Sequence, residues 1–247
     1  MDLNWTLIAV VAAINFAAAL LQASCGFGYA MLAMTLMPLV LPMQTCSAVS
    51  AVTVVAIGLQ MVLLLRRHIR FRQILLPLCG CFMTTRLGIW CLLHFPEQTL
   101  RWILAGLIFL LTGFFFYMQH RSIRLRDKWY CGLGTGLVTG LSTGMFNIVG
   151  PFFMVYYASI MDDPLCVKAS LECSFLAAGA YATVLHLRSG TFVPEGVPLY
   201  AASALAALLA GVIGLRLYRH IDRKMLARVI YVLLPLLAVT LLLKGRS

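Results

Sequence analysis

The amino-acid sequence predicts an all-α polytopic membrane protein made of two inverted structural repeats, each with about five transmembrane or half-membrane helices. Of its 247 residues, 62% are hydrophobic and 11% are charged, and the mean hydropathy is +0.95. A soluble domain of this length has no use for so much apolar surface. In addition, the basic residues gather in short loops between apolar segments, and weak internal similarity links the two halves of the chain.

Ten apolar segments are long enough to cross, or nearly cross, the hydrocarbon layer of a membrane. The second and the seventh are short and contain or adjoin glycine and proline. Each of these two is therefore either a half-helix, a re-entrant piece or a complete crossing. The ten segments cover residues 5–24, 28–42, 45–66, 73–94, 99–118, 129–146, 148–161, 165–187, 195–217 and 225–243.

The net charge of +11 is concentrated in three loops, which hold thirteen of the nineteen Lys and Arg residues. The positive-inside rule places such loops in the cytoplasm. With the N-terminus outside and all segments crossing, the three loops fall on the same side of a bacterial cytoplasmic membrane. No basic folded face remains for nucleic acid. The thirteen residues are Arg66, Arg67, Arg70, Arg72, Arg121, Arg124, Arg126, Lys128, Arg216, Arg219, Arg223, Lys224 and Arg228.

A glycine-rich stretch over residues 132–151 stands out within the apolar sequence. Its glycines recur every four residues, which places them on one helix face where another backbone can approach closely. They are Gly132, Gly136, Gly140 and Gly144. The stretch then runs into Asn147, Gly150 and Pro151, which interrupt the helix at membrane depth and free backbone polar groups.

The two halves of the chain share identical residues at a regular separation. We therefore expect a first membrane repeat over residues 1–120, a cytoplasmic basic linker over 121–128 and a second membrane repeat over 129–247. Pairs separated by 121 positions are Ala48 with Ala169, Gly58 with Gly179, Phe71 with Phe192 and Pro77 with Pro198.

The repeat gives the interrupted stretch a partner, because residues 22–30 of the first half correspond to residues 140–146 of the second. Both end a helix of small residues with a glycine, followed within two residues by an aromatic residue. Secondary transporters built from inverted repeats bind their substrates where such broken segments meet near the midplane. We expect the binding site at this meeting point.

At these residues the chain resembles the sulfite exporter (TauE/SafE) family of membrane transporters. The first-half motifs are QASCGFGYAML and LPMQTCSAVSAVTVVAIGLQ, and the second-half motifs are GLSTGMFNIVGPFF and DDPLCVKASLECSFLAAGAY. The resemblance implies passive or ion-coupled movement of small anions, namely sulfite, organosulfonates or small carboxylates, often outward. Cys25 and Phe27 depart from the glycine-rich first motif that is usual in the family.

An anion inside the membrane needs hydrogen-bond donors in place of water, from helix N-termini and from a few side chains. Neutral polar residues and glycines near both breaks supply them. The alternative for the Ser and Thr residues is that they only tie helices together. The predicted substrate-binding residues of this set are Gln22, Ser24, Gly26, Gly28, Ser142, Thr143, Asn147 and Gly150.

Three charged residues within apolar segments complete the predicted site. Arg86 either binds the anion or extends its side chain to the membrane interface. Lys168 and Glu172 are four residues apart and share a helix face. Glu172 is either a protonatable group that couples transport to an ion or one half of a structural ion pair with Lys168.

Other functions are less well supported. Gly140, Ser142 and Gly144 match the G-x-S-x-G motif of hydrolases, but that motif requires a strand–turn–helix context. His186, the candidate base, has no acidic residue placed to orient it, so we predict no enzyme. The eight cysteines lie in apolar segments without a CxxC pattern, which predicts no metal and no cofactor. A non-transporting membrane scaffold is the alternative function, and a homo-oligomer remains open.

Overall fold

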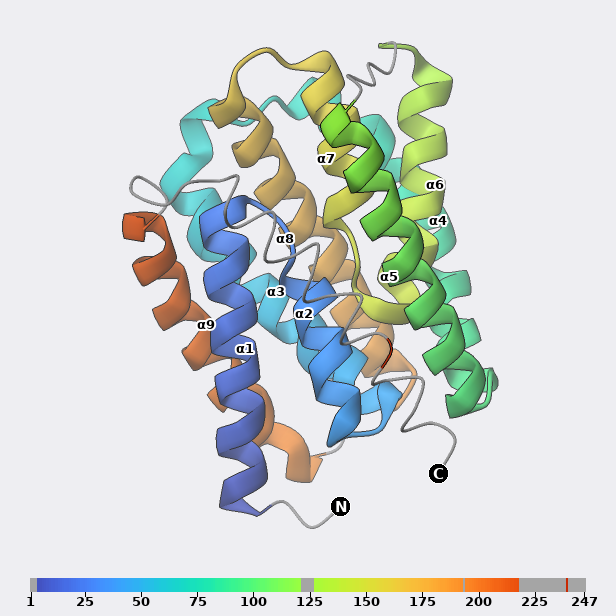
Figure 1. Cartoon of the computed structure of the whole chain (residues 1–247), viewed down its shortest axis with the longest axis vertical. Coiled ribbons are helices and arrows are strands. Elements are labelled where there is room, and N and C mark those ends of the chain that lie inside the picture. The colour runs from blue at the N-terminus through green and yellow to red at the C-terminus, as the bar shows by residue number, and fades with distance from the viewer. Residues whose placement is uncertain (1–3, 121–126, 193, 218–238, 240–247) are drawn as a thin grey trace.

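The computed structural model describes residues 4–120, 127–192, 194–217 and 239, and the described part is helical throughout with short connections (Figure 1). The prediction of an all-α protein is confirmed. The helices are α1 (Trp5–Cys25), α2 (Tyr29–Leu36), α3 (Met43–Leu65), α4 (Phe71–His94), α5 (Glu97–His120), α6 (Trp129–Phe146), α7 (Gly150–Ile160), α8 (Pro164–Arg188) and α9 (Val197–Leu217). Most of the predicted linker and nearly all of the tenth segment lie outside the described residues.

Five of the described helices, α1, α3, α4, α8 and α9, are long and apolar enough to cross a membrane. Their outward faces carry large apolar side chains, for example Leu64, Leu75 and Leu205, which a soluble protein would bury. Trp5 and Trp129 are exposed at the first residues of α1 and α6, where interfacial tryptophans are typical. The chain is therefore a multi-pass membrane protein.

The two short segments form half-length helices. α2 has 8 residues and α7 has 11, which correspond to lengths of about 12 and 17 Å at 1.5 Å per residue. The hydrocarbon core is about 30 Å thick. Neither helix can cross it, so the structure decides against complete crossings for both segments.

The glycine face of α6 packs directly on the backbone of α4, as the four-residue spacing predicts. A Cβ at Gly136 would lie 2.1 Å from the carbonyl oxygen of Pro77, and one at Gly140 would lie 2.0 Å from that of Cys81. A Cβ at Gly144 would meet the next turn of α4 in the same way. Only glycine allows this approach. Gly132 differs from the other three, because its nearest neighbour is the side chain of Tyr156.

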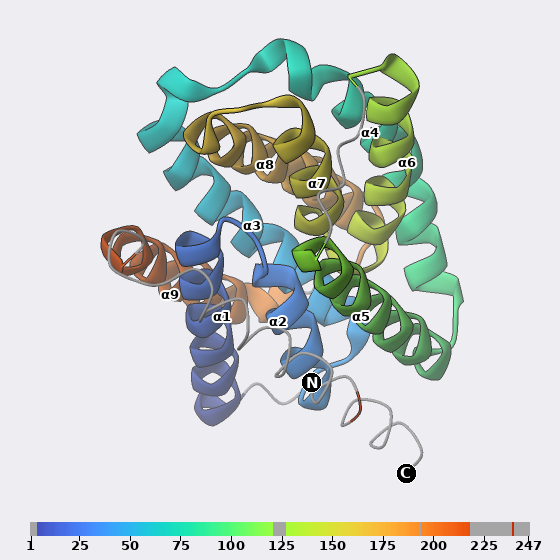
Figure 2. The ribbon, with the colours of Figure 1, turned by 45° about the horizontal axis from the view of Figure 1, so that its top comes forward.

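The helices pair in a pattern that repeats along the chain. α4 packs along α6, α9 packs along α1, and α3 and α8 pack together between these two pairs (Figures 1 and 2). In both halves a long helix is followed by a short one and then by two long ones. Figure 1 shows α1 and α6 running in opposite vertical directions. The inverted repeat remains a prediction, and this order and pairing support it.

The close α4–α6 contact can be tested by adding one methyl group. Gly140→Ala should lower the free energy of unfolding by at least about 2 kcal/mol, because the added Cβ overlaps backbone and overpacked sites relax poorly. Thermal unfolding in detergent would measure the change. Gly134, also on α6, has no heavy atom within 4 Å of its Cβ position. Gly134→Ala is the matched control and should keep or raise the Tm; equal behaviour of the two variants would contradict the packing account.

Candidate functional site

Two helix breaks form the centre of the molecule. α1 ends at Cys25, and the chain then turns through Gly26 at φ +88° and Gly28 at φ +110° before α2 begins. α6 ends at Phe146, and Asn147 follows at φ +54°. Asn147 is the one non-glycine residue with positive φ in the described part of the chain. Asparagine tolerates this left-handed conformation better than other residues with a Cβ.

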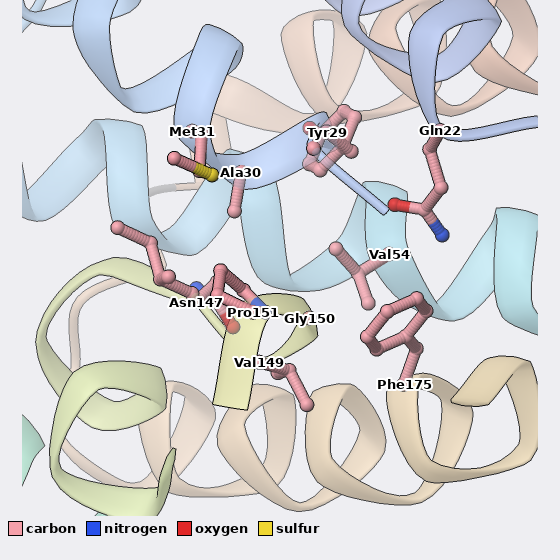
Figure 3. Close-up of a pocket in the computed structure, with 12 residues that line it drawn as sticks. Gln22, Tyr29, Ala30, Met31, Val54, Asn147, Val149, Gly150, Pro151 and Phe175 are labelled. Atoms are coloured by element: carbon pink, nitrogen blue, oxygen red, sulfur yellow. The ribbon is translucent and has the colours of Figure 1, made fainter. Parts of the chain in front are cut away.

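The two breaks meet. A Cβ at Gly150, the first residue of α7, would lie 2.9 Å from Cβ of Phe27 in the first break. A small cavity lies between them, and Figure 3 shows side chains of both breaks facing it. Its lining residues are Gln22, Gly28, Tyr29, Ala30, Met31, Val54, Asn147, Ile148, Val149, Gly150, Pro151 and Phe175. Four predicted site residues, Gln22, Gly28, Asn147 and Gly150, are thus brought together.

The first break is held by α8. Nε2 of Gln22, in the last turn of α1, donates to Oε2 of Glu172 at 3.1 Å. Nζ of Lys168 donates to the carbonyl oxygen of Ala23 at 2.8 Å. That carbonyl belongs to the last turn of α1, where backbone oxygens lack partners within the helix. Lys168 and Glu172 are buried and interact electrostatically. We call these four residues the α8 clamp.

The second break is held by α3. Nδ2 of Asn147 donates to the carbonyl oxygen of Ser47 at 2.8 Å and lies 3.3 Å from its Oγ. The same Oγ lies 3.2 Å from Nε2 of His186, which is buried near the end of α8. We call Asn147, Ser47 and His186 the α3 clamp. Sequence reasoning missed Ser47 and gave His186 no role, because each partner lies a hundred or more residues away.

Ser142 and Thr143 brace the end of α6. Oγ of Ser142 donates to the carbonyl oxygen of Ile148 at 2.7 Å, across the break. Oγ1 of Thr143 donates to the carbonyl oxygen of Thr139, one turn back in the same helix, at 2.7 Å. Thr143 therefore shows the helix-tying geometry that was the alternative to substrate binding. Ser24 is buried next to the first break, and its Oγ has no hydrogen-bond partner among the residues that the structure describes.

A second polar cluster fixes α2 and was missed by sequence reasoning. The hydroxyl of Tyr29, the first residue of α2, donates to Oδ1 of Asn15 on α1. Nδ2 of Asn15 lies 3.3 Å from Oγ of Ser203 on α9. All three residues are buried. Because Tyr29 also lines the cavity, this cluster links the position of α2 to the α1–α9 pair.

Several buried polar atoms around the breaks have no hydrogen-bond partner within the described part of the chain. They include Oε1 of Glu172, Oδ1 of Asn147 and Nδ1 of His186. Buried polar groups are normally hydrogen-bonded, and leaving one unpaired costs about 1–3 kcal/mol. Such atoms are the groups that a bound polar ligand or water would satisfy. They lie in both clamps, and Asn147 also lines the cavity.

Arg86 does not line the cavity between the two breaks. Its side chain is exposed on α4 and lines a separate cavity that it shares with Arg188 of α8. The two cavities have no lining residue in common. The structure therefore separates Arg86 from the other predicted site residues.

The hydrolase motif has no catalytic geometry in the structure. Ser142 lies in the last turns of helix α6, not in a strand–turn–helix elbow, and its hydroxyl binds backbone oxygens. His186 contacts Ser47 and not Ser142. Among the residues that the structure describes, no three His, Cys, Asp or Glu side chains are grouped to hold a metal ion.

The fold and the site together define a multi-pass membrane transport protein, in which two interrupted helices meet at one buried cavity. Residues 11–241 match the family model described as Sulfite exporter TauE/SafE. The chain belongs to this family, and the match covers both breaks and both clamps. Because this is a family of transporters, membership also supports the prediction that the chain is not an enzyme. No curated protein and no solved structure matches the chain.

The α8 clamp can be tested by a double-mutant cycle. Lys168→Met should destabilise the protein by about 3–5 kcal/mol, because it leaves the buried Glu172 carboxylate without its cation. Replacing both residues, Lys168→Met with Glu172→Leu, should recover much of that loss. Thermal or denaturant unfolding in detergent would measure Lys168→Met, Glu172→Leu and the double variant against the wild type. Additive effects of the two single substitutions would show that the side chains are not coupled.

Proposed function

We propose that the protein is a secondary transporter that moves small anions of the sulfite, organosulfonate or small carboxylate class across the cell membrane, in the outward direction. The observation that carries this proposal is the meeting of two interrupted helices at one buried polar cavity. Interrupted backbone at membrane depth occurs only where it is covered by protein or lines a cavity. A scaffold protein would have no need for it.

The first turns of α2 and α7 are the groups best suited to bind an anion. Both helices begin at the cavity, and the first four N–H groups of a helix have no partner within it. Their dipoles also present partial positive charge at that end. Pro151 removes one donor from α7. The anion should therefore contact α2 around Tyr29 and Ala30 more closely than α7.

The cavity is closed in this conformation. Its volume is about 10 Å³, which is about the space that one water molecule requires. An oxyanion such as sulfite has four heavy atoms and does not fit. Binding therefore requires the two breaks to separate, and the close contact between Gly150 and Phe27 must open. Movement of the α4–α6 pair, which carries the second break, against the α1–α9 pair, which carries the first, would provide this opening.

The two clamps contact α8 at different depths. Glu172 and His186 are fourteen residues apart on this helix, which corresponds to about 21 Å along its axis. The α8 clamp lies toward the start of α8 and the α3 clamp toward its end. Releasing the α8 clamp would free the break between α1 and α2, and releasing the α3 clamp would free the break between α6 and α7. If only one clamp is released at a time, the cavity can open on one side of the membrane while it stays closed on the other. This is the alternating access that transport requires.

The charges of the α8 clamp suggest how an anion and a proton would move together. With Glu172 ionised, its charge and that of Lys168 cancel. With Glu172 protonated, Lys168 leaves one net positive charge beside Gln22, which lines the cavity. That charge favours binding of an anion. Combined movement of one proton with a singly charged anion is electroneutral, so its direction would follow the sum of the two gradients.

Flux measurements on purified protein in liposomes would test the transport proposal. Sulfite, a sulfonate and a small carboxylate should be compared, and at least one should move faster than through protein-free liposomes. Asn147→Leu should reduce the flux at least tenfold, because it removes the contact to Ser47 and a polar group from the cavity. Gln44→Leu, an exposed position at the start of α3, is the control. Folded protein that moves none of these anions would contradict the proposal and favour a scaffold.

The role of Glu172 has a separate test. Glu172→Gln keeps the shape of the side chain and an oxygen that can accept from Gln22, but it cannot exchange a proton. Anion flux in this variant should no longer respond to an imposed pH gradient, while exchange of the anion persists. Glu97→Gln, an exposed carboxylate paired with Arg101 on α5, is the control. If the gradient still drives flux in Glu172→Gln, the carboxylate is structural.

A further inference from the structure

The second cavity lies between the last turns of α4 and α8. Its volume is about 400 Å³, large enough for a sizeable polar group. Every lining residue comes from the second half of α4, from the last two turns of α8 or from Ser189. They are Arg86, Ile89, Trp90, Leu93, Tyr181, Val184, Leu185, Arg188 and Ser189.

Two guanidinium groups share this cavity without an anionic partner. No acidic residue is among those that line it. In the part of the chain that the structure describes, neither Arg86 nor Arg188 makes an ion pair or a side-chain hydrogen bond. Like charges that share one pocket repel each other, and they repel more strongly beside apolar walls than in water. An anion between them would remove that repulsion and could be held by several N–H donors at once.

The position of the cavity points to the headgroup level of the membrane. Arg188 is the last residue of α8, and Arg86 lies eight residues before His94, the last residue of α4. Eight residues correspond to about 12 Å of helix, a depth from which an arginine side chain can reach the interface. Trp90, which also lines the cavity, is an aromatic residue of the kind enriched at this level.

The surroundings of the cavity favour a ligand with hydrocarbon chains. Large apolar side chains are exposed on both helices next to it, namely Met83 and Leu87 on α4 and Val184 and Leu187 on α8. A free anion gains nothing from these side chains. The acyl chains of a lipid would lie along them while the headgroup enters the cavity. Basic pockets between transmembrane helices on the cytoplasmic side take anionic lipid headgroups, and the same pairing of arginine with phosphate operates at the outer face.

We propose that Arg86 and Arg188 bind the phosphate group of an anionic phospholipid in the cavity between α4 and α8. The site lies at the opposite end of α4 from the basic residues Arg66 and Arg67. The predicted topology therefore places the lipid in the outer leaflet. This role differs from substrate binding at the two breaks and does not depend on the transported anion.

Native mass spectrometry of the detergent-purified protein would count bound lipid. After addition of phosphatidylglycerol, the wild-type protein should retain one more lipid molecule than the double variant Arg86→Gln with Arg188→Gln. Arg101→Gln is the matched control, because Arg101 is paired with Glu97 on α5, outside this cavity. It should retain the lipid. Equal lipid counts in all three proteins would overturn the proposal.

Thermal unfolding separates the two sources of the phosphate group and checks folding. Phosphatidylglycerol should raise the Tm of the wild-type protein by several degrees and that of the double variant by less. Before lipid is added, the double variant should be at least as stable as the wild type, because the repulsion between the two arginines is gone. Inorganic phosphate at millimolar concentration should leave both unchanged. If phosphate alone raises the wild-type Tm, the site belongs to a free oxyanion and the lipid assignment is wrong. Neither readout involves transport, so this proposal and the transport proposal fail independently.

Discussion

Backbone polar groups inside a membrane must find partners within the protein, and this constraint organises the whole structure. The chain interrupts two helices in its interior, at residues 26–28 and 147–149. Each interruption is covered by the other and held by a long helix from the opposite half. α8 supplies Lys168 and Glu172 to the first break, and α3 supplies Ser47 to the second. The polar groups at each break thus find their partners only when the two halves pack together.

The two clamps occupy related positions and differ in chemistry. Ser47 is the fifth residue of α3 and Lys168 the fifth of α8, and the two are separated by the repeat spacing of 121 residues. The predicted repeat therefore places a neutral serine and a cation at equivalent sites. Lys168 donates to the carbonyl oxygen of Ala23 at the first break, and Ser47 accepts from Asn147 at the second. The charged clamp holds Glu172, the carboxylate that we propose to exchange a proton during transport. The neutral clamp connects instead to the buried His186.

Close helix packing makes these contacts possible and divides the molecule into units. α4 and α6 touch through backbone at Gly136, Gly140 and Gly144, which leaves little freedom for sliding. α1 and α9 meet through small side chains at the equivalent place, where Gly214 faces Ala23. Each pair has one helix from each predicted repeat. Movement of the α1–α9 pair would carry the first break, and movement of the α4–α6 pair would carry the second. Rigid pairs joined by two releasable clamps suit a transporter that alternates its access.

The sequence by itself determined the membrane class, the positions of both breaks and the glycine face of α6, because apolar periodicity and small-residue spacing are local properties. Through the repeat it also grouped Gln22, Gly28, Asn147 and Gly150, which the structure brings to one cavity. Only the tertiary structure decided which partners meet. Ser47 and His186, for example, are 139 positions apart in the sequence. Arg86 was predicted to join the site, and only the structure shows that its side chain lines a different cavity. Such contacts depend on how whole helices rotate and pack against each other, and no short stretch of sequence records that.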